Sequence, residues 1–129
     1  MSTKVTFQEI VACLLHSRNQ AHVYHWQTKG VSSNAQHLAL GEYYESIIGL
    51  VDNMVETYQG KYGIVTGYNA YLKEYTLNEL ENNASVYFDL LVVELEKYKA
   101  FFTDTWMINI FDTIIETAYK TKYKLDNLQ

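Results

Sequence analysis

Apolar residues recur at spacings of three and four along most of the chain, which is the pattern of helices that bury one face. Four segments carry such a stripe, and we expect helices over residues 7–28, 34–59, 77–101 and 104–125. The sequence contains no proline, the residue that most often interrupts a helix. The expected core residues are Phe7, Ile10, Val11, Leu14 and Ala21, then Leu40, Tyr44, Ile47, Ile48, Val51, Val55 and Tyr58, then Leu77, Leu80, Ala84, Tyr87, Phe88, Leu91, Leu95 and Tyr98, and finally Met107, Phe111, Ile114, Ala118 and Leu125.

Residues suited to capping mark the expected helix starts. In a capping box, a Ser or Thr side chain accepts a hydrogen bond from the backbone N–H three residues later, and a Glu or Gln at that position reaches back. For the fourth helix, Thr103 or Asp104 is the expected cap. The three capping boxes are Thr6 with Glu9, Ser33 with Gln36, and Thr76 with Glu79.

The three connections between these helices are short, long and short in turn. Short connections make neighbouring helices antiparallel, whereas the long middle one, residues 60–75, can cross the bundle. The second and third helices can then run in the same direction, as they do in ferritin-like bundles. We therefore expect an all-α, ferritin-like four-helix bundle with a long crossover between its second and third helices, formed by residues 1–129 as a single domain.

Composition and charge exclude several classes of function. The net charge of −5 argues against a sequence-independent grip on nucleic acid phosphates, so we do not expect DNA binding. A single cysteine, Cys13, rules out an internal disulfide and suits a reducing compartment. We expect no signal peptide, and no apolar run in these residues is long enough to span a bilayer. We therefore expect a cytoplasmic protein without a membrane segment.

Three of the four histidines cluster around the first turn. His25 lies one turn before the first helix ends and His37 one turn after the second begins, so the two side chains lie at similar depth on antiparallel neighbours. Neutral histidine is the commonest metal ligand, although hydrogen-bonded structural histidines at the end of a bundle are the alternative. All three clustered residues are expected to continue the core stripes, with His22 behind the site or merely packed. His16, on the other side of its helix, is expected to be exposed.

Two carboxylates on the second helix complement the histidines. Asp52 and Glu56 are four residues apart and share one helix face, which is either a solvated face or part of a metal site. Asp52 lies 15 residues after His37, which at the rise of an α-helix is roughly 22 Å. Only a second copy, with its second helix antiparallel across a twofold axis, can bring these carboxylates to the histidines. A di-iron site within one bundle is not expected, because the sequence has no Glu-x-x-His.

The segment from His25 to Gly60 resembles the Dps-like miniferritins. It reads HWQTKG from His25, then His37 twelve residues later, then VDNMVETYQG, and the family pattern is His-Trp-x-x-x-Gly, His and Asp-x-x-x-Glu at these spacings. The family binds Fe(II), oxidises it with hydrogen peroxide or oxygen, and stores ferric mineral inside a dodecameric cage. The resemblance therefore implies a ferroxidase, that is, an oxidoreductase acting on Fe(II), in a cytoplasmic homo-oligomer.

The same resemblance implies a set of site residues divided between subunits. His25 and His37 would come from one subunit and the carboxylates from its twofold mate. Trp26 would correspond to the tryptophan packed beside the ferroxidase centre. The Lys-rich tail with which some members bind DNA is missing. The implied iron ligands are His25, His37, Asp52 and Glu56.

One departure from the family pattern concerns the iron ligands. The family usually has an Asp four residues after the second His, where this chain has Gly41. A glycine inside a helix costs about 1 kcal/mol relative to alanine, so Gly41 either makes room for close packing or marks a degraded site. Glu45 is the residue that could compensate by reaching across the dimer. With one carboxylate fewer, the site is di-iron or single-metal, and zinc or manganese becomes an alternative to iron. The competing hypothesis is a catalytically degraded ferritin-like scaffold that acts as a structural or protein-interaction module.

Overall fold

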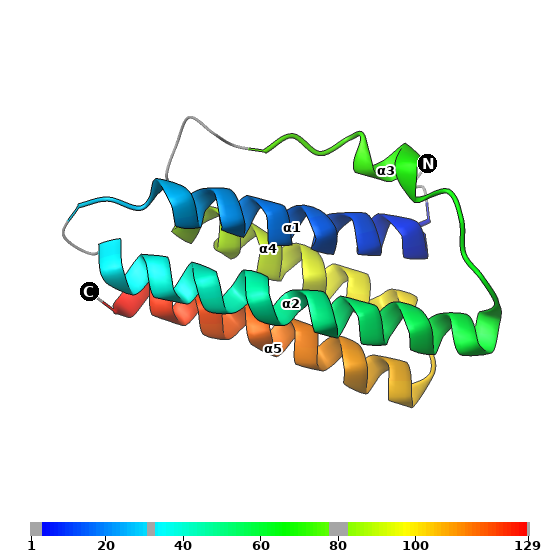
Figure 1. Ribbon diagram of the computed structural model, residues 1–129. Helices are drawn as coiled ribbons and strands as arrows, with labels where there is room; N and C mark the ends of the chain where they lie inside the picture. Colours follow the sequence, from blue (N-terminus) through cyan, green and yellow to red (C-terminus); the bar gives the residue numbers. More distant parts are fainter. Residues whose placement is uncertain (1–3, 31–32, 78–82, 129) are drawn as a thin grey trace.

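The computed structural model describes residues 4–30, 33–77 and 83–128. Within these residues all the regular structure is helical, which confirms the all-α prediction and is compatible with a helical bundle (Figure 1). The elements are α1 (Phe7–Gln27), α2 (Ser33–Tyr62), the short α3 (Tyr68–Leu72), α4 (Ala84–Tyr98), the 3-10 helix η1 (Lys99–Phe101) and α5 (Thr105–Asn127).

Four long helices lie side by side, and the contacts at their ends fix their directions. At the end of the bundle where the C-terminus lies, Glu42 near the start of α2 pairs with Lys124 of α5. There too, Ser85 at the start of α4 donates a hydrogen bond to Asp126 of α5. The helices α2 and α4 therefore run in the same direction, antiparallel to α5 (Figure 1). After α2 the chain, as far as residue 77, passes outside the bundle, with α3 packed on α1.

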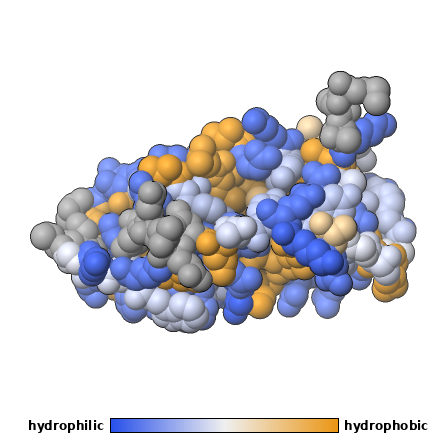
Figure 2. All heavy atoms as spheres, turned by 90° about the horizontal axis from the view of Figure 1, so that it is seen from above, coloured by the Kyte–Doolittle hydropathy of each residue, from blue (hydrophilic) through white to orange (hydrophobic). Residues whose placement is uncertain are grey.

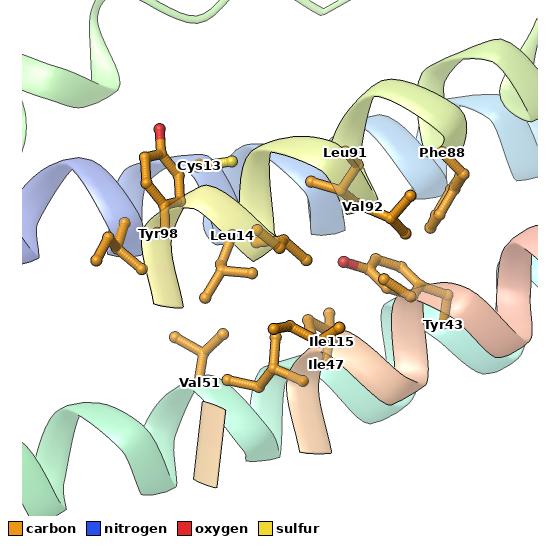
Figure 3. Close-up of a cluster of buried hydrophobic side chains, with 14 of the residues drawn as sticks. Cys13, Leu14, Tyr43, Ile47, Val51, Phe88, Leu91, Val92, Tyr98 and Ile115 are labelled. Carbon is orange, nitrogen blue, oxygen red and sulfur yellow. The ribbon is translucent and has the colours of Figure 1, made fainter. Parts of the chain in front are cut away.

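Side chains from all four long helices meet in one core (Figure 3). The stripes expected on the first and fourth helices are buried, as predicted. On α2 the prediction is partly wrong, because Ile48 is 43% exposed whereas Tyr43 and Met54 are fully buried. The physical reason is that α2 packs between α1 and α5, so the core takes the line of Tyr43, Ile47 and Met54. Ile48 then lies on the outer flank of the helix.

The helix starts agree with the capping predictions in part. Thr6 accepts a hydrogen bond from the Glu9 N–H at 3.2 Å, as expected. Asp104 stands at the cap of α5 but makes no side-chain capping bond, because its carboxylate accepts from Lys61 and Tyr62 instead.

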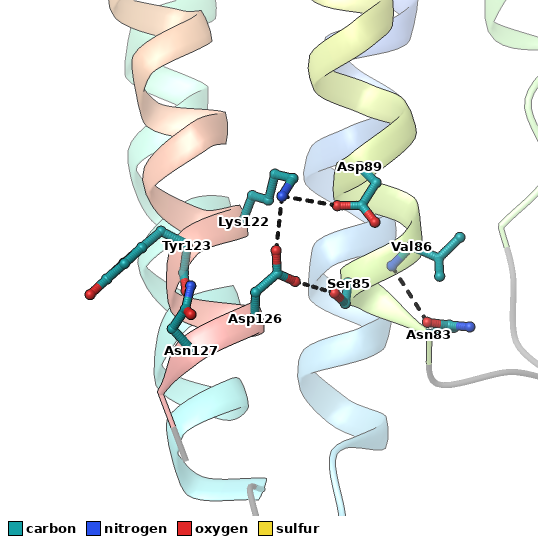
Figure 4. Close-up of polar contacts among 8 residues, drawn as sticks. All are labelled: Asn83, Ser85, Val86, Asp89, Lys122, Tyr123, Asp126 and Asn127. Carbon is teal, nitrogen blue, oxygen red and sulfur yellow. Dashed lines mark hydrogen bonds and ion pairs between the residues drawn. The ribbon is translucent and has the colours of Figure 1, made fainter.

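The start of α4 is a correction to the prediction. The helix begins at Ala84 rather than at residue 77, and the Asn83 side chain accepts from the Val86 N–H at 3.4 Å (Figure 4). Leu77 is described and is not helical, while Leu80 and Glu79, the second residue of the third capping box, lie outside the described residues. The backbone carbonyl of Thr76 is held against α1 by His16, which keeps this stretch out of the helix.

Ion pairs join the helix ends without deciding the stability of the fold. Lys122 pairs with both Asp126 and Asp89, and thereby links the end of α5 to α4 (Figure 4). Exposed pairs of this kind contribute about 0 to 1 kcal/mol each.

Within the described ranges, no helix is both long and apolar enough to cross a membrane. The face that carries α3 mixes hydrophilic and apolar side chains (Figure 2).

His16 is half-buried, so the expectation that it is exposed is wrong. Its Nε2–H donates to the Thr76 carbonyl at 3.3 Å, and its Nδ1 accepts from the Tyr87 hydroxyl at 3.3 Å. The ring also stacks on Tyr75, with centroids 4.7 Å apart. Burial lowers the pKa of His16, against the smaller raising effect of the bond to Thr76.

This environment predicts a pH dependence of stability. A histidine whose pKa is lowered by folding contributes stability above its unfolded pKa, near 6.5, and loses that contribution as the pH falls through the folded value. The free energy of unfolding should therefore decrease from about pH 7.5 to about pH 5.5. The decrease should be smaller in His16→Gln, which keeps a donor and an acceptor but does not titrate. Urea unfolding at both pH values measures this, and an equal decrease in both proteins would contradict the assignment.

Candidate metal centre

The rings of His25 and His37 stack face to face where α1 ends and α2 begins. Their centroids are 3.6 Å apart and their planes differ by 21°. The prediction that the two side chains lie at similar depth on neighbouring helices is therefore confirmed. Their expected place on the core stripes is wrong, because His25 is only half-buried and His37 is exposed. Both side chains lie at the outer edge of the contact between α1 and α2. The buried positions of α2 follow a line that passes one residue away from His37.

Reciprocal hydrogen bonds fix the orientation of both rings. His25 Nδ1 lies 2.7 Å from the carbonyl oxygen of His37, and His37 Nδ1 lies 3.0 Å from that of His25. A carbonyl oxygen only accepts, so each Nδ1 carries the hydrogen and donates it. In the neutral ring the lone pair is then on Nε2. Metal-binding histidines are commonly held in this way, with one nitrogen bonded to a carbonyl and the other free for the metal.

Two neighbouring residues that the sequence did not single out complete this arrangement. The Thr28 hydroxyl donates to the His25 carbonyl at 3.1 Å and thereby ties the turn to the end of α1. Tyr44 lies edge-on to His25, with centroids 5.2 Å apart. Tyr44 lies one helical turn beyond Gly41 on the same side of α2, and this spacing in the sequence could have identified it. Thr28 carried no such signal, because its role depends on the path of the turn.

His22 is a packed residue whose ring contacts two other aromatic residues. Its ring centroid lies 4.1 Å from that of Tyr44 and 4.1 Å from that of Trp26. Desolvation lowers the pKa of His22, and the charges of Arg18 and His25 lower it further. Trp26 is 68% exposed. Within one chain this indole therefore covers His22 and not the stacked pair.

Gly41 lies directly against the ring of His25. A Cβ atom added at Gly41 would be 3.2 Å from Cε1 and 3.4 Å from Nδ1 of that ring. Real Cβ atoms rarely approach a neighbour so closely, so even alanine would require the ring to move. Of the two explanations that the sequence left open, this contact supports the first: the glycine makes room for close packing.

The predicted carboxylates lie on α2, away from the histidines. Asp52 and Glu56 are both exposed. Asp52 lines a groove of about 320 Å³ between α1 and α2, beside Leu15 and Val55. This groove and the stacked pair belong to the same α1–α2 flank, since His22 meets Tyr44 between them. In the described part of the chain, no three His, Cys, Asp or Glu side chains are grouped so as to hold a metal ion.

Glu45 lies on the side of α2 that faces α5. With Lys120 and Lys124 it lines a hollow of about 460 Å³ between α2 and α5. Position 45 therefore points toward α5, whereas Gly41 points toward α1. Glu45 does not join the histidine pair of its own chain.

Comparison with known proteins gives one match. No curated protein and no solved structure matches the chain. A family model described as a family of unknown function, DUF5856, matches residues 25–125, from the first histidine of the stacked pair to the last buried leucine of α5. The match covers more than three quarters of the sequence, and the chain belongs to the DUF5856 family.

Proposed function

We propose that the chain is a Dps-like, ferritin-like protein that binds Fe(II) and oxidises it at a site shared between subunits, for iron detoxification or storage. The observation that carries this proposal is the stacked pair of His25 and His37. Both Nδ1–H groups are committed to carbonyl oxygens, so both Nε2 lone pairs remain for a metal ion.

The arrangement of the helices supports the ferritin-like part of the proposal. In ferritin-like bundles one long connection makes the second and third long helices parallel. Here α2 and α4 both begin beside the end of α5, and α3 lies outside α1 on the connection between them. The order of elements is therefore compatible with a ferritin-like crossover.

A second copy supplies the remaining ligands. The histidine pair and Asp52 lie toward opposite ends of one α1–α2 flank, so a twofold axis between them brings each half-site to the other. Halfway between His37 and Asp52 along α2 lie residues 44 and 45, and Tyr44 contacts the rings of His22 and His25 on this flank. Two copies of Tyr44 would then meet near the axis. The dimer would hold two identical centres, each with His25 and His37 of one copy and Asp52 and Glu56 of the other. A dodecameric cage is the larger homo-oligomer that the resemblance implies.

The donor set suits the oxidation of iron. Imidazole and carboxylate are ligands that non-haem iron uses in proteins. Two carboxylates carry two negative charges, which favour Fe(III) over Fe(II) and so make the loss of one electron to peroxide or oxygen easier. The two neutral imidazoles orient the ion without adding charge. Zinc or manganese could bind the same donors, so the proposal rests on iron being the ion that reacts.

Anomalous diffraction at the iron edge tests the proposal directly. Crystals would be exposed to Fe(II) without oxygen, so that binding is seen before oxidation. We expect a peak between the histidine pair of one copy and Asp52 and Glu56 of its neighbour. The absence of a peak at saturating iron would contradict the metal site. It would favour the second candidate, a ferritin-like scaffold that binds another protein. The 68% exposure of the Trp26 side chain supports that alternative.

A further inference from the structure

We propose that the seam between α1 and α4 contains a binding site for a small organic cation, a protonated alkyl amine, with the Glu94 carboxylate as its counter-ion. The site is a pocket of about 310 Å³, which is at the lower end of the range for small-molecule sites. It lies on a different seam of the bundle from the histidine pair, so it does not depend on the function proposed above. The lining residues with a polar or sulfur-bearing group are Cys13 and His16 of α1, Tyr75 of the connection after α3, and Tyr87, Glu94 and Tyr98 of α4.

Glu94 carries a negative charge that no described side chain neutralises. The residue is half-buried, and none of the ion pairs formed by the described residues includes it. The other glutamate nearby on α4, Glu96, is exposed and accepts a hydrogen bond from the Tyr119 hydroxyl at 2.6 Å. A carboxylate that is partly removed from water without a partner raises the free energy of the folded chain, and a bound cation would lower it.

The titratable groups around Glu94 are neutral, so they do not repel a cation. Burial raises the pKa of the Cys13 thiol to about 12 and that of the Tyr75 hydroxyl to about 12, so both keep their protons at neutral pH. Burial lowers the pKa of His16, and its Nε2–H already donates to the Thr76 carbonyl. Among the lining residues, the charge of Glu94 therefore stands alone, and the ligand that suits it is positively charged.

The rest of the lining suits an organic ammonium ion better than a metal ion. Magnesium and calcium take about six or more oxygen ligands, and the pocket has one carboxylate. Aromatic rings such as tyrosine attract cations, and tyrosine oxygens accept hydrogen bonds from N–H groups. The Tyr98 hydroxyl lies on the same side of the core as Cys13, away from Val51 (Figure 3). Two leucines of α4 also line the pocket and offer apolar surface to an alkyl chain.

Titration of the labelled protein with n-butylammonium, followed by amide NMR, tests the proposal. We expect saturable shifts confined to the amides around residues 13–16, 75 and 87–98, with a Kd on the order of 1 mM for so small a probe. The neutral probe n-butanol has the same chain without the charge and should bind about 10-fold more weakly or less. The anion butyrate should not bind.

Glu94→Gln is the decisive variant, because it keeps the size of the side chain and removes its charge. It should weaken butylammonium binding by about 10-fold or more. Glu96→Gln is the matched control, since it removes the same charge from the same helix but lies outside the pocket lining. It should bind butylammonium as the wild type does. Circular dichroism and the unfolding midpoint would show that both variants fold.

Three results would overturn the proposal. They are the absence of saturable shifts at concentrations well above the expected Kd, equal affinities for butylammonium and butanol, and equal losses of affinity in the two glutamate variants. His37→Ala should bind butylammonium like the wild type, because the histidine pair lies on the other seam. The amine site and the metal site are therefore tested independently of one another.

Discussion

Replacing His37 by alanine is expected to lower the affinity for Fe(II) by at least about 100-fold, since changes behind the ligands of metal sites already cost 10-fold to 100-fold. The substitution removes one imidazole and also the Nδ1–H that His25 O accepts at 3.0 Å. It leaves the helical core untouched, because His37 is exposed. The measurement is anaerobic Fe(II) titration, with circular dichroism to establish folding. Unchanged affinity would mean that the stacked pair is structural.

The same series can show that the site is divided between two chains. A chain with His37→Ala would be refolded with a chain that carries Asp52→Asn and Glu56→Gln, and the mixed dimer would be purified with two different tags. Each variant alone should bind no ion. The mixed dimer combines the histidines of the second chain with the carboxylates of the first, so it should bind one ion per dimer.

A second acidic pair on α5 provides the control for the loss of charge. Asp112 and Glu116 are also four residues apart, with exposures of 45% and 63%. Asp112→Asn with Glu116→Gln should keep wild-type binding. Wild-type affinity in the Asp52→Asn, Glu56→Gln protein, or a mixed dimer that binds nothing, would contradict the intersubunit site.

The extent of the helices is largely predictable from the sequence, and the errors have physical causes. Burial of one helix face imposes a period of 3.6 residues, which is why the ends of α1 and α5 lie within two residues of the expected ones. The start of α4 does not follow from this period. The carbonyl of Thr76 accepts from His16, 60 residues earlier in the chain, and a contact of that range leaves no local pattern.

The candidate site shows the same division between local and non-local causes. The meeting of His25 and His37 is predictable because a short turn fixes the relative depth of two antiparallel helices. The contact between Gly41 and His25 is not, because it depends on how the His25 ring is turned by its bond to a carbonyl on the other helix. Two glycines of α2 therefore differ in their surroundings. A Cβ atom at Gly41 would press against the His25 ring, whereas one at Gly49 would contact nothing within 4 Å.

Replacing Tyr43 by alanine is expected to lower the free energy of unfolding by about 3 to 5 kcal/mol, the range for large aromatic residues in a core. Tyr43 is fully buried between α1 and α4 (Figure 3), with its ring edge-on to Phe88 at 4.8 Å. Tyr43→Phe keeps the ring and should cost only about 1 kcal/mol. Urea unfolding at neutral pH measures both changes.

The hydrogen bond made by the Tyr43 hydroxyl allows a second test of the same core, because the direction of that bond is known. Ser17 donates its single hydroxyl hydrogen to the Leu14 carbonyl at 2.7 Å, so the Tyr43 hydroxyl, 2.7 Å away, must donate to Ser17. Burial raises the pKa of Tyr43, which keeps that proton in place. Ser17→Ala leaves a buried donor without its acceptor and should cost about 1 to 3 kcal/mol. In the double variant with Tyr43→Phe no donor is stranded, so its loss should be smaller than the sum of the single losses. A strictly additive result would show that the hydrogen bond between α1 and α2 contributes nothing to the packing of the bundle.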